Sequence, residues 1–217
     1  AGPWSLLDVF RWLPLAANLL AIVAFYRLSC RLLASRAAAI YAVYAFSLLP
    51  RSFTWLIVGG GVTRSLGLLF AILAVHQAYR LYTEGGRRVL LTALFAGLTV
   101  LSHLDMALFV ACSAAVFFLL SLSLSRERVG VRVDVRRGEA FAGWEAGPGS
   151  LRRRLAVSGA AALGALLVAS PWWVTVIARH GLTPLLAEAG AGSRFFSWRS
   201  LLTLQLTGEV FFPLGAL

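Results

Sequence analysis

The chain lacks lysine altogether and has only two cysteines, one methionine and nine acidic residues among 217. Cys30 and Cys112 lie far apart inside apolar segments. They therefore exclude a disulfide framework and match no metal-binding spacing, and we expect both to be small core residues. The sequence also lacks the repeated apolar–polar alternation of a membrane-spanning sheet, so strands do not compete with helices as the main element.

Apolar residues dominate what is present. They make up 59% of the chain, and the mean hydropathy is +0.81, far above that of a soluble domain. Several apolar stretches approach the roughly 20 residues that a helix needs to cross a bilayer. We predict an all-α, polytopic membrane protein with about seven membrane segments. The expected segments are Val9–Leu28, Ala37–Val58, Val62–Leu81, Val89–Ser102, Leu104–Leu124, Leu155–Ile177 and Leu201–Leu217.

The formal net charge is +11, and all 20 basic residues are arginines. A nucleic-acid-binding protein would gather such charge on one soluble face. Here most arginines lie in short links between apolar segments, so we predict no nucleic-acid partner and expect these links to face the cytoplasm. The links contain Arg27, Arg31 and Arg36, then Arg80, Arg87 and Arg88, then eight arginines between Arg126 and Arg154. The polar stretch 125–154 is accordingly expected to be a cytoplasmic loop.

The two ends of the chain resemble cut ends. It begins Ala-Gly-Pro-Trp without an initiator methionine, and it stops inside an apolar run. We expect residues 1–217 to form a single transmembrane domain that belongs to a larger protein, with the lipid bilayer as its surroundings.

An imidazole and a carboxylate interrupt the apolar run from Val89 to Ser125 at His103 and Asp105. The run is too long for one crossing and slightly short for two. We therefore predict a helical hairpin whose turn carries both residues at the outer membrane surface. Ionisable groups at that depth are costly, so they are candidates for function. They could share a metal ion, orient an acceptor hydroxyl, or form a structural ion pair that closes the hairpin.

A second candidate site begins where the second apolar segment is interrupted by Pro50 and Arg51. The stretch Gly59-Gly60-Gly61-Val62-Thr63-Arg64 follows and opens the next segment. The glycines allow close backbone approach, and Thr63 is a candidate cap for a helix whose N-terminus attracts anions. Arg64 adds a fork that suits phosphate oxygens. We favour an anion site here over a simple glycine-rich loop with an interfacial arginine.

Two further outer features are less specific. Arg179-His180-Gly181 follows Ser170-Pro171-Trp172-Trp173 at the outer end of the sixth segment, where we expect a helix to end. His76 lies in the third segment and is expected to be a packing residue.

These motifs together resemble a family. Pro50-Arg51, Gly59 to Arg64 with Gly67, Leu98 to Asp105, and Ser170 to Gly181 are similar to bacterial membrane glycosyltransferases of the GT-C type, in the dolichyl-phosphate-mannose-mannosyltransferase-like branch. The resemblance covers most of the chain. It implies transfer of a sugar from a polyprenyl-phosphate carrier to an acceptor at the outer face of a bacterial plasma membrane.

The resemblance also assigns roles. Arg51, Gly60, Gly61, Thr63, Arg64, Arg179 and His180 would bind the phosphate of the carrier, and His103 and Asp105 would be catalytic or hold a divalent ion, Mg or Mn. Family members usually carry an acidic residue or pair in the first outer loop, as a base or metal ligand. Here Asp8 is the only nearby acid, so we expect that loop to precede Ala1 and leave the catalytic base unassigned. The turn also has Leu104 and Asp105 where a His-Pro-Glu-like form is expected.

Two other functions fit the same residues. A transporter or flippase for an anionic lipid-linked substrate would also use broken membrane segments and inward-facing arginines. An accessory membrane subunit would carry outer charges that only pair with one another.

Overall fold

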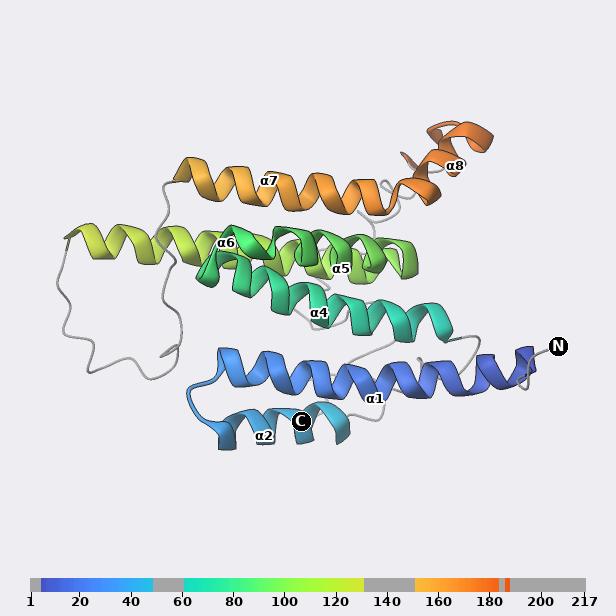
Figure 1. Ribbon diagram of the computed structural model, residues 1–217, viewed down its shortest axis with the longest axis horizontal. Coiled ribbons are helices and arrows are strands. Elements are labelled where there is room, and N and C mark those ends of the chain that lie inside the picture. The colour runs from blue at the N-terminus through green and yellow to red at the C-terminus, as the bar shows by residue number, and fades with distance from the viewer. Residues whose placement is uncertain (1–4, 49–60, 131–150, 184–185, 188–217) are drawn as a thin grey trace, which may run out of the picture. The chain divides into compact units, whose positions relative to one another are not determined.

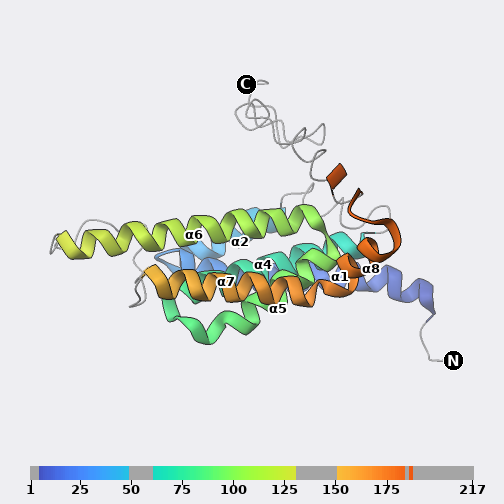
Figure 2. The ribbon, with the colours of Figure 1, turned by 90° about the horizontal axis from the view of Figure 1, so that it is seen from above.

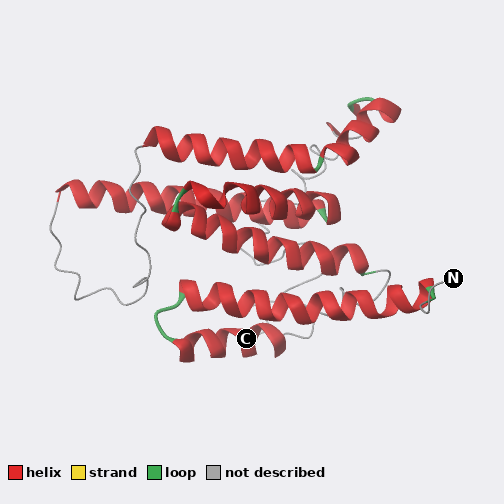
Figure 3. Cartoon of the chain, viewed as in Figure 1, coloured by secondary structure: helices red, strands yellow, loops and turns green. Residues whose placement is uncertain are grey.

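The structure is a computed structural model that describes residues 5–48, 61–130, 151–183 and 186–187. Every regular element in these ranges is a helix, and no strand occurs in them (Figure 3). The chain divides into two compact units, Ala1–Ala169 and Ser170–Leu217. The all-α prediction is confirmed for the described part of the chain.

The first unit is a bundle in which α4 takes the central place (Figure 1). Helix α4 packs against α1, α5 and α6, while α2 packs on the outer side of α1 and α7 packs on α5. The helices are α1 (Leu6–Leu32), α2 (Arg36–Leu48), α4 (Val62–Glu84), the short 3-10 helix η1 (Gly86–Arg88), α5 (Val89–Ser102), α6 (Leu104–Gly130) and α7 (Leu151–Val168). The described helix of the second unit is α8 (Ser170–His180).

Within the described ranges, three helices are long and apolar enough to cross a membrane: Asp8–Leu32, Val62–Glu84 and Leu104–Ser123. A fourth span results if α7 and α8 together form one broken crossing. Helices α2 and α5 are shorter, with 13 and 14 residues. The predicted count of seven is therefore not confirmed; the end of Ala37–Val58 and all of Leu201–Leu217 lie outside the described residues.

The predicted segment Leu155–Ile177 is wrong as a single helix. Helix α7 ends at Val168, and α8 begins at Ser170. Pro171 explains the break, because its ring lacks an N–H and would clash with the carbonyl four residues earlier if the helix continued. At the second position of α8, the same proline is tolerated. The expected loop 125–154 is also shorter, since α6 extends to Gly130 and α7 already begins at Leu151.

Alanines make many of the contacts inside the bundle, and many large apolar residues face outward. Helix α1 places Ala17, Ala21, Ala24 and Leu28 in the core against α4. This spacing defines one helix face. Leucines on the opposite face, such as Leu19 at 58% exposure, remain uncovered by protein. Such packing suits a membrane, where close approach of helices replaces the hydrophobic effect as the source of association.

The two cysteines follow the same pattern. Cys30 and Cys112 are unpaired, as expected, but both lie on the exposed surface of the bundle rather than in its core. The prediction of core positions was wrong because alanine and glycine already occupy the close contacts. His76, by contrast, is buried in α4, as expected of a packing residue.

The arginine-rich ends of three helices meet at one end of the bundle around Glu84. Arg80 contacts the Glu84 carboxylate at 2.8 Å and Arg88 at 3.1 Å, and Arg31 from the end of α1 lies at 4.0 Å. The hydroxyl of Tyr79 also donates to the carbonyl of Arg31 at 3.1 Å. The first two basic links of the sequence are therefore neighbours in space.

Helices α5 and α7 approach each other through glycine. A Cβ at Gly97 would lie 2.5 Å from the Cβ of Val168 and 2.8 Å from the carbonyl oxygen of Ala165. A Cβ at Gly164 would lie 2.7 Å from the Cβ of Ala93. These distances are too short for carbon–carbon contact, so the helix spacing depends on the absence of side chains at both positions.

We expect Gly97→Ala to destabilise the bundle by about 1–3 kcal/mol, because the added methyl group must push α7 away from α5. The same change at Gly159, which has no atom within 4 Å of its virtual Cβ, is the matched control. There alanine should stabilise the helix by about 0.5–1 kcal/mol. Thermal unfolding of the purified variants in detergent measures the difference, and equal midpoints for the two variants would contradict the packing described.

Candidate functional site

The predicted hairpin is present, and its turn consists of one residue. Helix α5 ends at Ser102 and α6 begins at Leu104, and the two helices run antiparallel (Figure 1, Figure 2). His103 between them has an extended backbone, with φ −160° and ψ 116°. Its N–H donates to the carbonyl of Thr99 at 2.8 Å, and its carbonyl accepts from Ala107 at 3.2 Å. The turn therefore satisfies its own backbone groups.

The His103 side chain is seated against α4 at Gly67. A Cβ at Gly67 would lie 2.7 Å from the Cβ of His103, so only glycine permits this approach without a shift. The His103 side chain is 21% exposed. Its Nδ1 atom is buried and has no hydrogen-bond partner within the described ranges. The ring therefore carries an unsatisfied donor or acceptor at this position, and leaving such a group buried is destabilising.

Asp105 is presented differently. Its side chain is 90% exposed, and its Oδ2 lies 3.8 Å from Nδ1 of His103. This separation exceeds a hydrogen bond but falls within reach of an ion pair when the histidine is protonated. Asp105 also lies in the first turn of α6, where a carboxylate interacts favourably with the helix N-terminus. The Asp105 carboxylate is thus accessible to a ligand at the surface, beside the largely covered imidazole of His103.

The glycine-rich segment leads into α4, as predicted, but Thr63 is not its cap. The N-cap is Gly61, and no side chain accepts a capping hydrogen bond there. Gly61 has φ −59°, so it does not use the positive φ open to glycine. The predicted cap was therefore wrong, whereas the predicted start of the segment at Val62 agrees with the start of α4. Gly60 and Arg51 lie outside the described residues.

Ser65 is a polar residue of this turn that the sequence analysis did not single out. It is completely buried, and its hydroxyl donates to the carbonyl of Gly61 at 2.6 Å. A hydroxyl four residues after the start of a helix commonly bonds back in this way. The spacing of Gly61 and Ser65 was the available signal. The bond fixes the first turn of α4, which contains Arg64.

Arg64 and the hairpin turn belong to the same end of the bundle. Arg64 precedes Gly67 by three residues, so the two are neighbours on one side of α4. Gly67 in turn contacts His103. The structure therefore brings two of the sequence-predicted groups together, the Arg64 segment and the His103–Asp105 turn, although they are about 40 residues apart in the chain.

A divalent ion would find an incomplete set of ligands here. His103 and Asp105 provide one nitrogen and one carboxylate, but within the described residues no group of three His, Cys, Asp or Glu side chains gathers. Mg or Mn takes about six ligands, mainly oxygen, and would need several from water or substrate. We therefore derive no step through a metal.

The remaining candidates have local structural roles. Asp8 accepts from the backbone N–H of Ser5 at 3.0 Å and from its hydroxyl at 2.6 Å, which closes a capping box at the start of α1. Arg179 and His180 are exposed in the last turn of α8, where basic residues complement the helix dipole. Gly181 ends that helix with φ 69°, as predicted from the sequence. Phosphate binding by Arg179 and His180 stays a prediction.

Comparison with known protein families, with characterised proteins and with solved structures gave no match to this chain.

The contact between Gly67 and His103 can be tested by a double-mutant cycle. Gly67→Ala should destabilise the protein by about 1–3 kcal/mol, because the new methyl group collides with the His103 Cβ. His103→Ala retains that Cβ and should not relieve the collision, whereas His103→Gly removes it. We therefore expect Gly67→Ala to be tolerated far better in the His103→Gly background. Thermal unfolding in detergent provides the four stabilities, and equal effects of Gly67→Ala in both backgrounds would refute the contact.

Proposed function

We propose that the chain is the membrane part of a glycosyltransferase that moves a sugar from a polyprenyl-phosphate carrier to an acceptor at the outer membrane face. The observation that carries the proposal is the seating of His103 against Gly67. It holds an exposed carboxylate, Asp105, at the end of the bundle where α4 begins and where Arg64 lies in its first turn. Arg64, as a cation for the phosphate leaving group, and Asp105, as a carboxylate for the acceptor hydroxyl, then lie at the same end of the bundle.

The proposed chemistry is a displacement at the anomeric carbon of the sugar. Asp105 accepts the proton of the acceptor hydroxyl as the new oxygen–carbon bond forms. The bond between the anomeric carbon and the phosphate oxygen breaks, and its electron pair stays on the phosphate. The Arg64 guanidinium stabilises the charge that develops there. His103, whose Nδ1 lies 3.8 Å from Asp105, acts as a positioning residue for the carboxylate.

The distribution of arginines supports the same proposal. The arginines around Glu84 mark one end of the bundle, and cytoplasmic ends of membrane proteins carry such an excess. Helix α5 leads from η1 at that end to His103 at the other. The candidate site then faces outward from a bacterial plasma membrane, where a lipid-linked sugar is used.

Transport of an anionic lipid-linked substrate is the second candidate function. The interruption between α7 and α8 at Ala169 favours it, because transporters use broken helices to line their substrate sites. The two functions differ in whether a bond is broken.

We expect Arg64→Ala and Asp105→Asn each to lower sugar transfer at least about 100-fold in the full-length protein, since each removes a group that acts on charge in the transition state. The assay is release of polyprenyl phosphate from a set of polyprenyl-phosphate hexoses in reconstituted vesicles.

Asp8→Asn is the control, because Asp8 is a carboxylate engaged in a helix cap; it should affect stability by no more than about 1 kcal/mol and leave turnover in place. Full turnover in both Arg64→Ala and Asp105→Asn would overturn the proposal. Movement of the wild-type donor across the vesicle membrane without release of polyprenyl phosphate would favour transport instead.

A further inference from the structure

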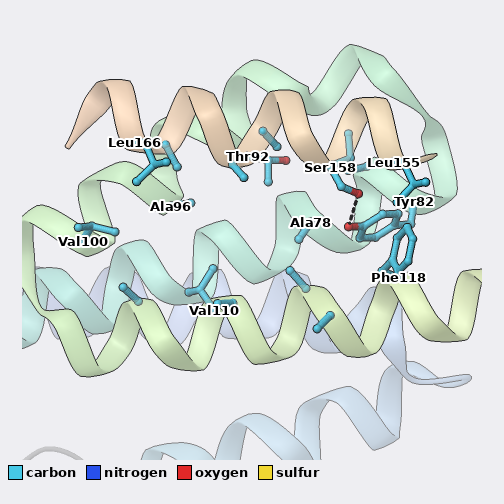
Figure 4. Close-up of a pocket in the computed structure, with 18 residues that line it drawn as sticks. Ala78, Tyr82, Thr92, Ala96, Val100, Val110, Phe118, Leu155, Ser158 and Leu166 are labelled. Carbon is cyan, nitrogen blue, oxygen red and sulfur yellow. Dashed lines mark hydrogen bonds between the residues drawn. The ribbon is translucent and has the colours of Figure 1, made fainter. Parts of the chain in front are cut away.

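A cavity of about 560 Å³ lies in the first unit between α6 and α7 (Figure 4). We call it the α6–α7 slot. Helix α7 packs on α5 and helix α6 packs on α4, so α6 and α7 form its two walls and residues of α4 and α5 form its floor. Alanines make up half of its lining, which keeps the space open along its length.

The slot has the length of one lipid chain. On α6 its lining extends from Ala107 to Phe118, and on α7 from Leu155 to Leu166. At 1.5 Å per residue, each wall is about 17 Å long. Half of the roughly 30 Å hydrocarbon core of a bilayer is about 15 Å, the depth that the acyl chain of one leaflet covers. A single extended acyl chain therefore matches the slot.

The chemistry of the lining also selects hydrocarbon. The Tyr82 hydroxyl and the Ser158 hydroxyl are hydrogen-bonded to each other at 2.9 Å, and the Thr92 hydroxyl donates to the carbonyl of Arg88 at 2.9 Å. These polar groups are thus satisfied by the protein itself, and the other lining residues are apolar. A sugar or another polar ligand would lose its hydrogen bonds with water and gain none in return.

Hydrogen bonds between the helices close the slot at its arginine-rich end. The Tyr82–Ser158 bond joins α4 to α7, and a guanidinium nitrogen of Arg154 donates to the carbonyl of Ser121, which joins α7 to α6. Arg154 is buried there at 7% exposure. Arg152 and Arg153 lie at the same end of α7, in its first turn, and are exposed. This end of the slot therefore carries an excess of positive charge, which attracts the phosphate of an anionic lipid.

We propose that the α6–α7 slot binds one acyl chain of an anionic phospholipid whose phosphate lies at the arginine-rich end, beside Arg152 and Arg153. This lipid is distinct from the carrier of the proposed transferase, whose phosphate would lie at the opposite, His103 end. Binding to the folded state alone raises the unfolding temperature, so the proposal predicts lipid-dependent stability whether or not the protein transfers a sugar.

The test compares two lipids with identical chains, dioleoyl phosphatidylglycerol and dioleoyl phosphatidylcholine, added to the full-length protein in detergent. We expect the anionic lipid to raise the unfolding midpoint by about 5 °C at a hundredfold excess over its Kd. The zwitterionic lipid should have a much smaller effect. Phospholipid that remains with protein extracted from membranes, identified by mass spectrometry, should be enriched in anionic species.

Two matched pairs of variants locate the effect. Ala162 lines the slot, whereas Ala160 is exposed on the same helix outside the lining. Ala162→Phe should abolish the shift caused by the anionic lipid, and Ala160→Phe should preserve it. Replacing both Arg152 and Arg153 with glutamine should reduce the difference between the two lipids. Arg11→Gln, in the first helix near its start, should leave that difference unchanged.

Several outcomes would overturn the proposal. One is an equal shift from both lipids, and another is a full response in Ala162→Phe. A third is the absence of any lipid response combined with a lipid-free midpoint that falls in Ala162→Phe but not in Ala160→Phe. That result would mean that protein, from this chain or from a partner, covers the slot. Retained anionic lipid in the extracted wild type keeps the test decisive if Ala162→Phe does not fold.

Discussion

The arrangement of this bundle depends on how closely its helices can approach one another where a side chain is missing. In a bilayer the exclusion of water contributes little to helix association, so contact between backbones and small side chains has to provide it. Gly97 and Gly164 allow α7 to lie against α5, and Gly67 allows the hairpin turn to lie against α4. Many leucines, which would form the core of a soluble protein, face outward instead.

The same constraint positions the candidate site and creates the slot. Because His103 is fixed against Gly67, the start of α6 is fixed as well, and with it Asp105. Because α7 is held on α5 by its glycine contacts, it cannot also close against α6 along its whole length. The two helices are joined where Arg154 donates to the carbonyl of Ser121. One packing rule therefore accounts for both the polar region at one end and the apolar space beside it.

Much of this architecture could be predicted from the sequence, for identifiable reasons. The lengths of the apolar runs predicted the helices. The polar interruption at His103 predicted the hairpin, because ionisable groups are costly inside a membrane and a turn places them at its surface. The break before Pro171 was missed because the length of the apolar run was weighed above the proline, whose missing N–H was the available signal. The cap at Gly61 was missed because no side-chain hydrogen bond marks it. The exposure of Cys112 was missed because helix faces are chosen by packing partners, and a uniformly apolar helix shows no preferred face. Whether Arg51 joins Arg64 remains a prediction.

Glu84 has a consequence for how the helix ends behave. One carboxylate contacts guanidinium groups from the end of α1, from α4 itself and from the junction with α5. The Glu84 carboxylate therefore holds three segments together. If it were neutralised, their arginines would repel one another. Because three guanidinium groups share this single carboxylate, the positions of the three helix ends depend on one another.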